Sequence, residues 1–325
     1  MEYVKLGNSG LDVSRICLGC MSFGNTGEGS VKWHLNQDDS TALVKEAVNL
    51  GINFFDTANC YANGESERFL GKALKDYNRD EIVVATKVFI PMGEAPNRKG
   101  LSRKHIMAEI DHSLTRLGMD YVDLYITHRW DYHTPIEETM AALHDVVKAG
   151  KARYIGASAM YAWQFQKALY TAEKLNLTKF ISMQNHMNLM YREEEREMLP
   201  LLADQNISST PYSPLAAGRL ARPWEETTAR YTEDKMAVFK YDSTIDTDKP
   251  IALRVAEIAK QHGVPMAHIA LAWVLQKPEV AAPVIGATKT SHITDAVAAL
   301  AVKLTGEEVA YLEALYVPHK VVGAI

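Results

Sequence analysis

Four residues near the ends of short apolar runs have side chains that together could move a proton. Asp56, Lys87 and His128 each follow directly after such a run, and Tyr61 lies five positions beyond Asp56. Polar groups at the carboxyl ends of successive buried strands are how a parallel-sheet enzyme assembles its active site. An aspartate, a tyrosine, a lysine and a histidine gathered there make a poor metal cage or nucleophile triad. They predict proton-transfer chemistry instead.

The same four side chains fit chemistry at a carbonyl group. A free tyrosine has a pKa of about 10, but a neighbouring ammonium stabilises the phenolate and lowers that pKa. Lys87 could supply the ammonium, and Asp56 the counter-charge that a buried lysine needs. His128 could hydrogen-bond a substrate carbonyl oxygen and hold it over Tyr61. The set predicts a general acid for an oxyanion developing from C=O, or a general base in the reverse direction.

Each residue also has a structural explanation when it is taken alone. Asp56 could cap the turn after its strand, Tyr61 could pack in a wall, and His128 could be structural. Lys87 is harder to explain in this way, because an unpaired buried lysine is costly. The combination at consecutive strand ends therefore favours a catalytic site.

The elements that must position these residues alternate along the chain. Short runs rich in Ile, Val, Phe and Tyr predict strands near residues 15–19, 52–55, 82–86, 122–127, 153–157, 180–184, 207–211 and 282–285. Amphipathic stretches predict helices near residues 39–50, 65–77, 102–117, 135–149, 162–174, 194–204, 248–276 (two helices) and 291–300. Eight β-then-α units predict a (β/α)8 TIM barrel, with residues 1–325 forming a single domain.

A doubly wound sheet is the competing fold. That fold usually opens its cofactor site with G-x-G-x-x-G after the first strand, and residues 19–24 do not fit this pattern. Two features should decorate the barrel. Runs at 3–7 and 11–15 predict an N-terminal β-hairpin that plugs the bottom. The long polar stretch from Ala216 to Thr247 predicts an irregular loop after the seventh strand, above the site.

Helix ends are also marked in the sequence. Thr134 is predicted to cap a helix that has Pro135 at its first position. Gly150 stands where a left-handed residue would close that helix. The run Glu193–Glu195 predicts the acidic first turn of a solvated helix.

Composition excludes several classes of function. The 325 residues are 47% hydrophobic and 23% charged. The net charge of −5 gives no excess of positive charge that would favour binding to nucleic acid or an anionic membrane. No apolar stretch approaches the roughly 20 residues of a membrane helix, and the N-terminus has no signal-peptide core. Three cysteines and no paired metal motif predict a cytoplasmic protein without a metal site.

Two motifs resemble those of a known family. The pattern D-T-A-x-x-Y-x-x-G-x-S-E over residues 56–67, and the segment LTRLGMDYVDL over residues 114–124, resemble the two signatures of the aldo-keto reductases. The match extends in order over essentially the whole chain, and it is closest to the bacterial branch related to potassium-channel β subunits. The resemblance implies an NADPH-dependent carbonyl reductase on a (β/α)8 barrel. Tyr61 would donate the proton, with Asp56 and Lys87 tuning it and His128 orienting the carbonyl.

The resemblance also implies a set of cofactor-binding residues. Gly19, Cys20, Met21 and Asp56 would lie beside the nicotinamide. Ser158 and Gln184 would bind its carboxamide group, and the aromatic ring of Tyr212 would stack on the nicotinamide ring. Residues along the pyrophosphate would be Ser213, Leu215 and Gly218; those at the adenosine phosphate, Gly286, Thr288, Lys289 and His292.

The chain departs from the family pattern in places. Ala159 follows Ser158 where the family often has asparagine, and His292 and Ala296 stand where it often has glutamine and asparagine. The sequence therefore leaves open which residues would contact the adenine. Lys289 retains a positive charge for a 2′-phosphate, which favours NADPH. Lysine is a geometrically less demanding phosphate partner than arginine, so the use of NADH stays open.

Three aromatic residues are candidates for substrate contact. Trp33 lies on the first loop, Phe89 two positions past Lys87, and Trp130 two positions past His128. They would suit an apolar or ring-bearing carbonyl compound, with ordinary loop packing as the other explanation. The predicted function is NADPH-dependent reduction of a small aldehyde or ketone. Alternatives are a cofactor-sensing interaction subunit with residual activity, or alcohol oxidation by the same residues. The natural substrate and the oligomeric state stay open.

Overall fold

Eight parallel strands form one closed sheet at the centre of the molecule. The computed structural model describes residues 1–25, 33–226 and 234–324. The strand order is β10-β3-β4-β5-β6-β7-β8-β9. The strands are β3 (Cys17–Gly19), β4 (Phe54–Asp56), β5 (Val83–Val88), β6 (Val122–Thr127), β7 (Ala152–Ser158), β8 (Phe180–Gln184), β9 (Ser208–Ser209) and β10 (Val284–Gly286). Backbone hydrogen bonds close the sheet between its two end strands, β9 and β10. Ser209 N donates to Glu279 O at 2.7 Å, and Val284 N donates to Pro211 O at 2.8 Å. The predicted (β/α)8 barrel is confirmed.

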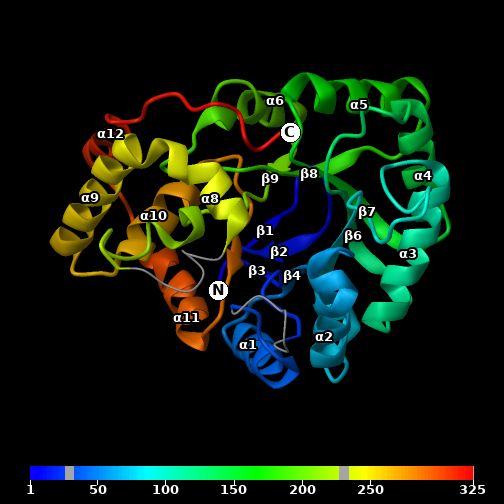
Figure 1. Ribbon diagram of the computed structural model, residues 1–325, viewed down its shortest axis with the longest axis horizontal. Helices are drawn as coiled ribbons and strands as arrows, with labels where there is room; N and C mark the ends of the chain where they lie inside the picture. Colours follow the sequence, from blue (N-terminus) through cyan, green and yellow to red (C-terminus); the bar gives the residue numbers. More distant parts are fainter. Residues whose placement is uncertain (26–32, 227–233, 325) are drawn as a thin grey trace.

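Helices surround this sheet as an outer ring (Figure 1). They are α1 (Gln37–Asn49), α2 (Glu65–Leu74), α3 (Arg103–Leu117), α4 (Ile136–Lys148), α5 (Ala162–Lys174), α6 (Met198–Gln205), α8 (Lys235–Tyr241), α9 (Ile245–His262), α10 (Met266–Leu275), α11 (Thr290–Ala298) and α12 (Gly306–Glu313). The predicted stretch 248–276 is two helices, as expected. Among the described residues, no helix is both long and apolar enough to cross a membrane.

Alternation along the strands divides the core in two. Cys17, Phe54, Val83 and Leu124 point into the barrel and pack in its interior cluster. Their neighbours along the strands belong to the larger cluster between the barrel and the helices. Because side chains alternate with a period of two, the next inward positions at the carboxyl ends fall on the site residues. The fold therefore turns the strand-end polar groups toward one another.

The N-terminal hairpin closes one end of the barrel. β1 (Tyr3–Lys5) and β2 (Asp12–Ser14) pair antiparallel, as the sequence predicts. Leu6 and Val13 of this hairpin join the interior cluster and are fully buried. Gly7 has φ +58, and a Cβ there would lie 2.1 Å from the carbonyl oxygen of Ile181, so only glycine lets the hairpin approach the barrel this closely. Its amide donates to Ser208 Oγ at 2.7 Å.

Two local predictions were wrong. The stretch from Ala216 to Thr247 was expected to be irregular, but it contains α8 and the start of α9; residues 227–233 lie outside the described structure. The helix predicted to begin at Pro135 begins at Ile136, and Thr134 does not cap it. Thr134 Oγ1 instead donates to Asp131 Oδ2 at 2.7 Å.

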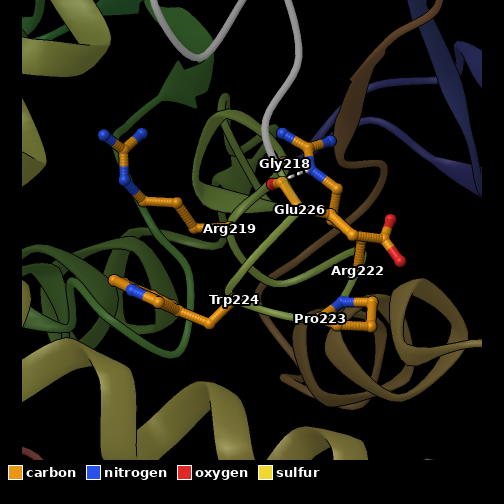
Figure 2. Close-up of a pocket in the computed structure, with 6 residues that line it drawn as sticks. All are labelled: Gly218, Arg219, Arg222, Pro223, Trp224 and Glu226. Carbon is orange, nitrogen blue, oxygen red and sulfur yellow. Dashed lines mark hydrogen bonds between the residues drawn. The ribbon is translucent and has the colours of Figure 1, made fainter.

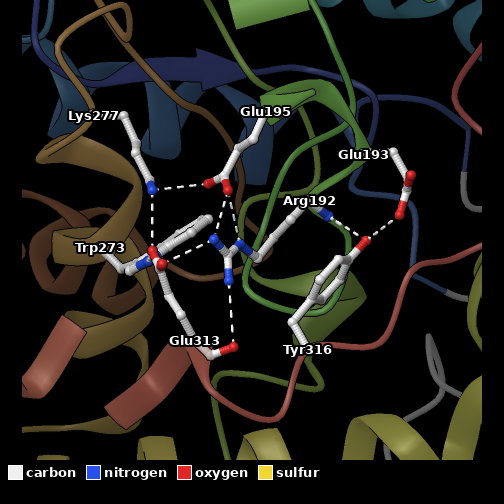
Figure 3. Close-up of polar contacts among 7 residues, drawn as sticks. All are labelled: Arg192, Glu193, Glu195, Trp273, Lys277, Glu313 and Tyr316. Atoms are coloured by element: carbon white, nitrogen blue, oxygen red, sulfur yellow. Dashed lines mark hydrogen bonds and ion pairs between the residues drawn. The ribbon is translucent and has the colours of Figure 1, made fainter. Parts of the chain in front are cut away.

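The acidic run Glu193–Glu195 is not the first turn of a solvated helix. It forms a short 3-10 helix whose side chains bind other elements. Glu193 accepts a hydrogen bond of 2.6 Å from Tyr316, and Glu195 pairs with Arg192 at 2.6 Å. Figure 3 shows how Arg192, Lys277 and Glu313 continue this network between the segment after β8, the residues that follow α10 and the end of α12. Burial raises the pKa of Glu194 to about 8.

Candidate active site

Asp56 and Lys87 meet inside the barrel at the ends of neighbouring strands. β4 and β5 pair in parallel, with Asp56 opposite Ala85, so Lys87 lies one inward position further along. The Lys87 ammonium contacts Asp56 Oδ1 and donates to the carbonyl oxygen of Thr57 at 2.9 Å. Both ionic side chains are buried. A buried lysine is tolerated when it is paired and hydrogen-bonded in this way.

Lys87 also reaches the tyrosine that the sequence selected. Its Nζ lies 3.4 Å from the hydroxyl of Tyr61 and 5.0 Å from the centroid of that ring. Asp56 is held from the other side, because Gln184 Nε2 donates to its Oδ2 at 2.9 Å. Four side chains from β4, β5, β8 and the turn after β4 thus form one connected chain of polar contacts.

An unusual turn presents Tyr61. Ala62, Asn63 and Gly64 follow it with φ of 46°, 54° and 90°, three left-handed residues in a row. Non-glycine residues in this region are uncommon and persist when the surroundings hold them. A Cβ on Gly64 would lie 2.6 Å from Arg116 Cδ, so this position needs glycine for space as well as conformation. The phenol is thereby fixed over Lys87 while its ring stays half-buried.

His128 completes the group. Its ring stands edge-on to Tyr61, with centroids 5.7 Å apart and planes at 83°. Its backbone N–H donates to Val88 O at 2.9 Å, which fixes the residue just beyond β6. Its Nδ1 lies 3.8 Å from Cys60 Sγ, a contact that the sequence did not predict.

The pKa shifts of Tyr61, Lys87 and His128 define the charges of these three side chains at neutral pH. Burial raises the pKa of Tyr61 to about 12, although Lys87 acts in the opposite direction. The sequence-based expectation of a lowered tyrosine pKa therefore describes the contribution of Lys87 but not the net shift. Burial alone would lower the pKa of Lys87, but Asp56 and then Tyr61 leave it raised. Burial and Lys87 hold the pKa of His128 well below its ordinary value, so that the imidazole is neutral.

A second ionic layer supports the site from behind. Thr86 Oγ1 donates to Glu67 Oε1 at 2.6 Å, and Arg116 Nε pairs with Glu67 Oε2 at 2.5 Å. Asn59 Nδ2 donates to Glu109 Oε2 at 3.1 Å. These contacts fix the residue before Lys87 and the turn before Tyr61. Glu67 and Arg116 lie within the two signature segments, but nothing in their spacing shows that they pair.

The residues predicted to lie beside the nicotinamide follow β3. Gly19 pairs with both Asp56 and Gly286, and a Cβ there would lie 2.8 Å from Val284 Cγ1. Cys20 is buried, and its amide donates to Asp56 O at 2.8 Å. Met21 is 36% exposed. This segment therefore borders the site through its backbone.

Ser158 and Gln184 lie at the ends of neighbouring strands. They are opposite each other in the β7–β8 register. Ser158 Oγ donates to Gln184 O at 2.8 Å, and both residues are buried. Since Gln184 also holds Asp56, the two predicted carboxamide residues are joined to the predicted catalytic residues.

Tyr212 lies where the barrel closes. Its backbone bridges His186 beyond β8 and Val284 of β10. His186 stacks on its ring, with centroids 5.1 Å apart and planes at 10°. Lys240 Nζ lies 4.3 Å from the same ring centroid. Because His186 covers one face, the ammonium lies over the face that the histidine leaves open.

The predicted pyrophosphate loop turns sharply after Tyr212. Ser213, Ala216 and Ala217 have φ of 54°, 48° and 54°, and Gly218 has φ +94. Leu215 is half-buried against the core. Figure 2 shows the guanidinium of Arg222 beside Gly218, where a Cβ would lie 2.8 Å from its NH1. Positive charge therefore lies directly against this loop.

The residues predicted for the adenosine phosphate form the turn from β10 into α11. Gly286 ends β10, and Lys289 immediately precedes the first helical residue. Thr288 N donates to His292 Nδ1 at 3.3 Å. Gly286, Lys289 and His292 are exposed. A helix N-terminus beside an exposed lysine is suited to a phosphate group.

Together these segments fit a nicotinamide dinucleotide. Tyr212 offers a ring face that is covered by a side-chain ammonium rather than by another ring. The hydroxyl of Tyr212 is buried and has no hydrogen-bond partner among the described residues. Cationic groups border the loop after Tyr212 and the start of α11, where the phosphates would lie. Across the described residues, no group of three or more histidine, cysteine and acidic side chains gathers as a metal site would require.

The three predicted substrate residues have separate surroundings. Trp130 packs against Trp163, with ring centroids 6.0 Å apart, and is half-buried. Trp33 stands edge-on to His34 at 4.9 Å, and a Cβ on Gly24 would touch both that loop and Ala62. Phe89 packs partly against the outer core. Trp130 is two residues from His128, whereas no described contact joins Phe89 to the four catalytic candidates.

The sequence missed several residues around the site. Lys240, His186 and Cys60 all contact predicted site residues. Lys240 is carried by α8, in the segment predicted to be irregular. His186 occurs in a loop with no motif spacing, and Cys60 is an unspecified position within the first signature, so only the folded structure reveals their contacts.

Comparison with known proteins gives a consistent family. The model of the family described as "Aldo/keto reductase family" matches residues 15–317. A versiconal hemiacetal acetate reductase of Aspergillus parasiticus is 44% identical, covering 99% of this chain and 98% of that protein. The aldo-keto reductase AMT2 of Alternaria alternata is 42% identical, covering 97% and 91%. A putative aryl-alcohol dehydrogenase of Saccharomyces cerevisiae is 40% identical, covering 98% of each.

These relatives correct one part of the sequence-based resemblance. All three come from fungi and are named as reductases or dehydrogenases. The predicted placement in a bacterial branch related to potassium-channel β subunits is not supported. The alternative of a cofactor-sensing interaction subunit rested on that placement.

Proposed function

The chain belongs to the aldo/keto reductase family, and we propose that it is an NADPH-dependent enzyme that reduces an aldehyde or ketone to an alcohol. The observation that carries this proposal is the contact chain from Asp56 through Lys87 to the Tyr61 hydroxyl, with neutral His128 edge-on to the phenol. When bound, the reduced nicotinamide would supply the hydride to the carbonyl carbon.

Tyr61 would donate the proton to the carbonyl oxygen. Its pKa of about 12 keeps it protonated at neutral pH, as an acid must be. The Lys87 ammonium, 3.4 Å from the hydroxyl, would stabilise the phenolate that remains after the transfer. Asp56 would keep Lys87 charged inside the barrel, which supports its role as a tuning residue.

His128 would orient the substrate. A neutral imidazole can donate one hydrogen bond to a carbonyl oxygen without adding a charge. Because the Cys60 thiol lies 3.8 Å from Nδ1, that nitrogen faces the protein and Nε2 is left for the substrate. Tyr61 and His128 would then hold the same oxygen from two directions.

The cofactor would lie across the carboxyl ends of the strands. Tyr212 would stack on the nicotinamide ring, with Gly19, Cys20 and Met21 beside it and Ser158 and Gln184 on the carboxamide. The turn of Ser213, Leu215 and Gly218 would follow the pyrophosphate. Gly286, Thr288, Lys289 and His292 would hold the adenosine phosphate, with Lys289 favouring NADPH over NADH.

The substrate class would be aromatic or apolar carbonyl compounds. Trp130 lies two residues from His128 and packs against Trp163, so it would provide an aromatic wall at the mouth. Relatives named as putative aryl-alcohol dehydrogenases support aromatic aldehydes as the first compounds to test. Trp33 and Phe89 remain candidates for the same wall.

The proposal is tested by turnover. The protein is mixed with NADPH and a panel of aromatic and aliphatic aldehydes, and the absorbance of the reduced cofactor is followed. Faster consumption with aromatic aldehydes is expected, together with the slower reverse reaction from the alcohols and NADP+. A protein that binds NADPH but consumes none of it with any carbonyl compound would contradict the proposed activity.

A further inference from the structure

Three aromatic rings form a column that ends on Tyr212. His186 stacks on Tyr212 at 5.1 Å with planes at 10°, and on Tyr191 at 4.3 Å with planes at 19°. His186 therefore lies between the two tyrosines. Because the Tyr212 hydroxyl has no partner in the described part of the chain, hydrogen bonding does not set the orientation of that ring. The stacking contact with His186 sets it.

His186 itself is firmly placed and uncharged. It is completely buried, and its Nε2 lies 2.8 Å from the hydroxyl of Tyr241 in α8. Asn188 Nδ2 donates to that hydroxyl at 3.0 Å and to the carbonyl oxygen of Ser213 at 2.9 Å. Burial, followed by the charge of Lys240, holds the pKa of His186 well below its ordinary value. The middle of the column therefore does not titrate near neutral pH.

The far end of the column is bound by the C-terminal tail, residues 319–324. The hydroxyl of Tyr191 accepts the amide N–H groups of Val322 at 3.2 Å and Gly323 at 3.4 Å. Arg129, next to His128, donates to the carbonyl oxygen of Gly323 at 3.1 Å. A Cβ on Gly323 would lie 3.1 Å from His186 Cβ, so the tail packs directly on the column.

We propose that His186 and Tyr191 are positioning residues for the cofactor, and that the C-terminal tail acts through them to hold the nicotinamide ring. The tail binds the hydroxyl of Tyr191, the ring of Tyr191 stacks on His186, and His186 in turn orients the ring of Tyr212. This proposal rests on the proposed stacking of the nicotinamide on Tyr212. It assigns the tail a role in cofactor binding that is separate from any contact with the substrate.

The expected effects are modest and specific to the nicotinamide. A stacked aromatic pair is worth about 0.5–1.5 kcal/mol beyond the area it buries, which corresponds to about two- to tenfold in a dissociation constant. Loss of the stack should therefore weaken NADPH by about two- to tenfold. It should leave adenosine 2′,5′-bisphosphate unaffected, because that compound carries the phosphates and adenosine but no nicotinamide.

The test measures the dissociation constants of NADPH and of adenosine 2′,5′-bisphosphate by quenching of protein fluorescence. The melting temperature of each variant is measured as well. His186→Leu removes the stack, and His186→Phe retains a flat ring that should restore NADPH binding. Tyr191→Phe keeps the ring but loses both tail contacts, so it should also weaken NADPH alone. Tyr311→Phe is the matched control, since it removes a tyrosine hydroxyl that donates to Glu257 of α9, away from the column and the tail.

The outcomes separate this proposal from the proposed function. Selective weakening of NADPH binding in His186→Leu and Tyr191→Phe, but not in Tyr311→Phe, supports the proposed role of the column. Equal weakening of both compounds, or no weakening of either, overturns it. A wild-type protein that binds neither compound contradicts the proposed function itself. If His186→Leu does not fold, Tyr191→Phe decides alone.

Discussion

Gln184 Nε2 donates a hydrogen bond of 2.9 Å to Asp56 Oδ2. A carboxylate only accepts hydrogen bonds, so this contact fixes the amide of Gln184 with its nitrogen toward Asp56 and its oxygen turned away. The residue predicted to hold the nicotinamide carboxamide thus also holds the counter-charge of Lys87. The predicted carboxamide residue and the group proposed to donate the proton are therefore parts of one hydrogen-bonded unit.

Removal of the Asp56 charge should destabilise the protein. In Asp56→Asn the buried ammonium of Lys87 loses its partner, and breaking a buried pair in this way costs about 3–5 kcal/mol in the free energy of unfolding. Urea denaturation measures the loss. The double variant Asp56→Asn/Lys87→Met should recover most of the stability but no turnover. A single variant as stable as the wild type would show that the pair is not buried as described.

The pH profile should lack an acid limb from histidine. Tyr61, with a pKa of about 12, stays protonated at neutral pH, so reduction should fall only at strongly alkaline pH. Alcohol oxidation needs the phenolate and should rise with pH over the same range. His128 is already neutral because its pKa is lowered, so it adds no transition near its ordinary value. The measurement is kcat/KM in both directions with saturating cofactor and a non-ionising substrate. A fall in kcat/KM for reduction as the pH is lowered from about 7 to 6 would contradict these assignments.

Lys240 should distinguish the two oxidation states of the cofactor. Its ammonium lies over the Tyr212 face on which the nicotinamide is proposed to stack, so it would have to move aside and would remain beside the bound ring. Only the oxidised ring is positively charged. Lys240→Met should therefore tighten NADP+ relative to NADPH by about two- to tenfold. Burial lowers the pKa of Lys240 to about 7, so the effect should be larger below that pH, where the lysine is charged.

Fluorescence titration with both cofactors at pH values on either side of this pKa tests the Lys240 prediction. Lys240→Arg keeps the charge at every pH tested, so it should match the wild-type ratio of the two dissociation constants below this pKa and retain that ratio above it. Lys235→Met is a matched control, because it removes an exposed charge from the same helix. An unchanged ratio in Lys240→Met would show that this ammonium does not sense the ring.

Lys289 should determine the preference for a phosphorylated cofactor. It is exposed immediately before α11, and a charge-assisted hydrogen bond to a phosphate is worth about 1.5–3 kcal/mol. Lys289→Met should reduce kcat/KM with NADPH by roughly tenfold or more and leave kcat/KM with NADH nearly unchanged. Lys289→Arg should retain most of the preference. Equal losses with the two cofactors would place the 2′-phosphate elsewhere.

The barrel and the grouping of Asp56, Tyr61, Lys87 and His128 were predictable from local patterns. Inward positions recur every second residue, so Phe54 predicts the direction of Asp56, and Ala85 that of Lys87. Strand ends in a parallel barrel meet at one face whatever their separation in sequence. Length and alternation were therefore enough to bring these residues together.

The remaining features depend on tertiary contacts. α8 has only seven residues, and it is held by the cap of Asp234 and the burial of Ala237 and Tyr241 rather than by a long periodic pattern. His186 and Tyr191 come from the loop after β8 and find their partners on segments far away in the sequence. The pKa of Tyr61 was expected to fall near Lys87, but burial, which sequence does not measure, has the larger effect.

Tyr61→Phe tests the central claim most directly. The variant keeps the ring against His128 but loses the hydroxyl 3.4 Å from Lys87. Single-turnover consumption of bound NADPH with an aromatic aldehyde should slow by about 10²–10⁴-fold, while the dissociation constant for NADPH stays within about twofold of the wild type. Undiminished turnover in this variant would show that Tyr61 is not the proton donor.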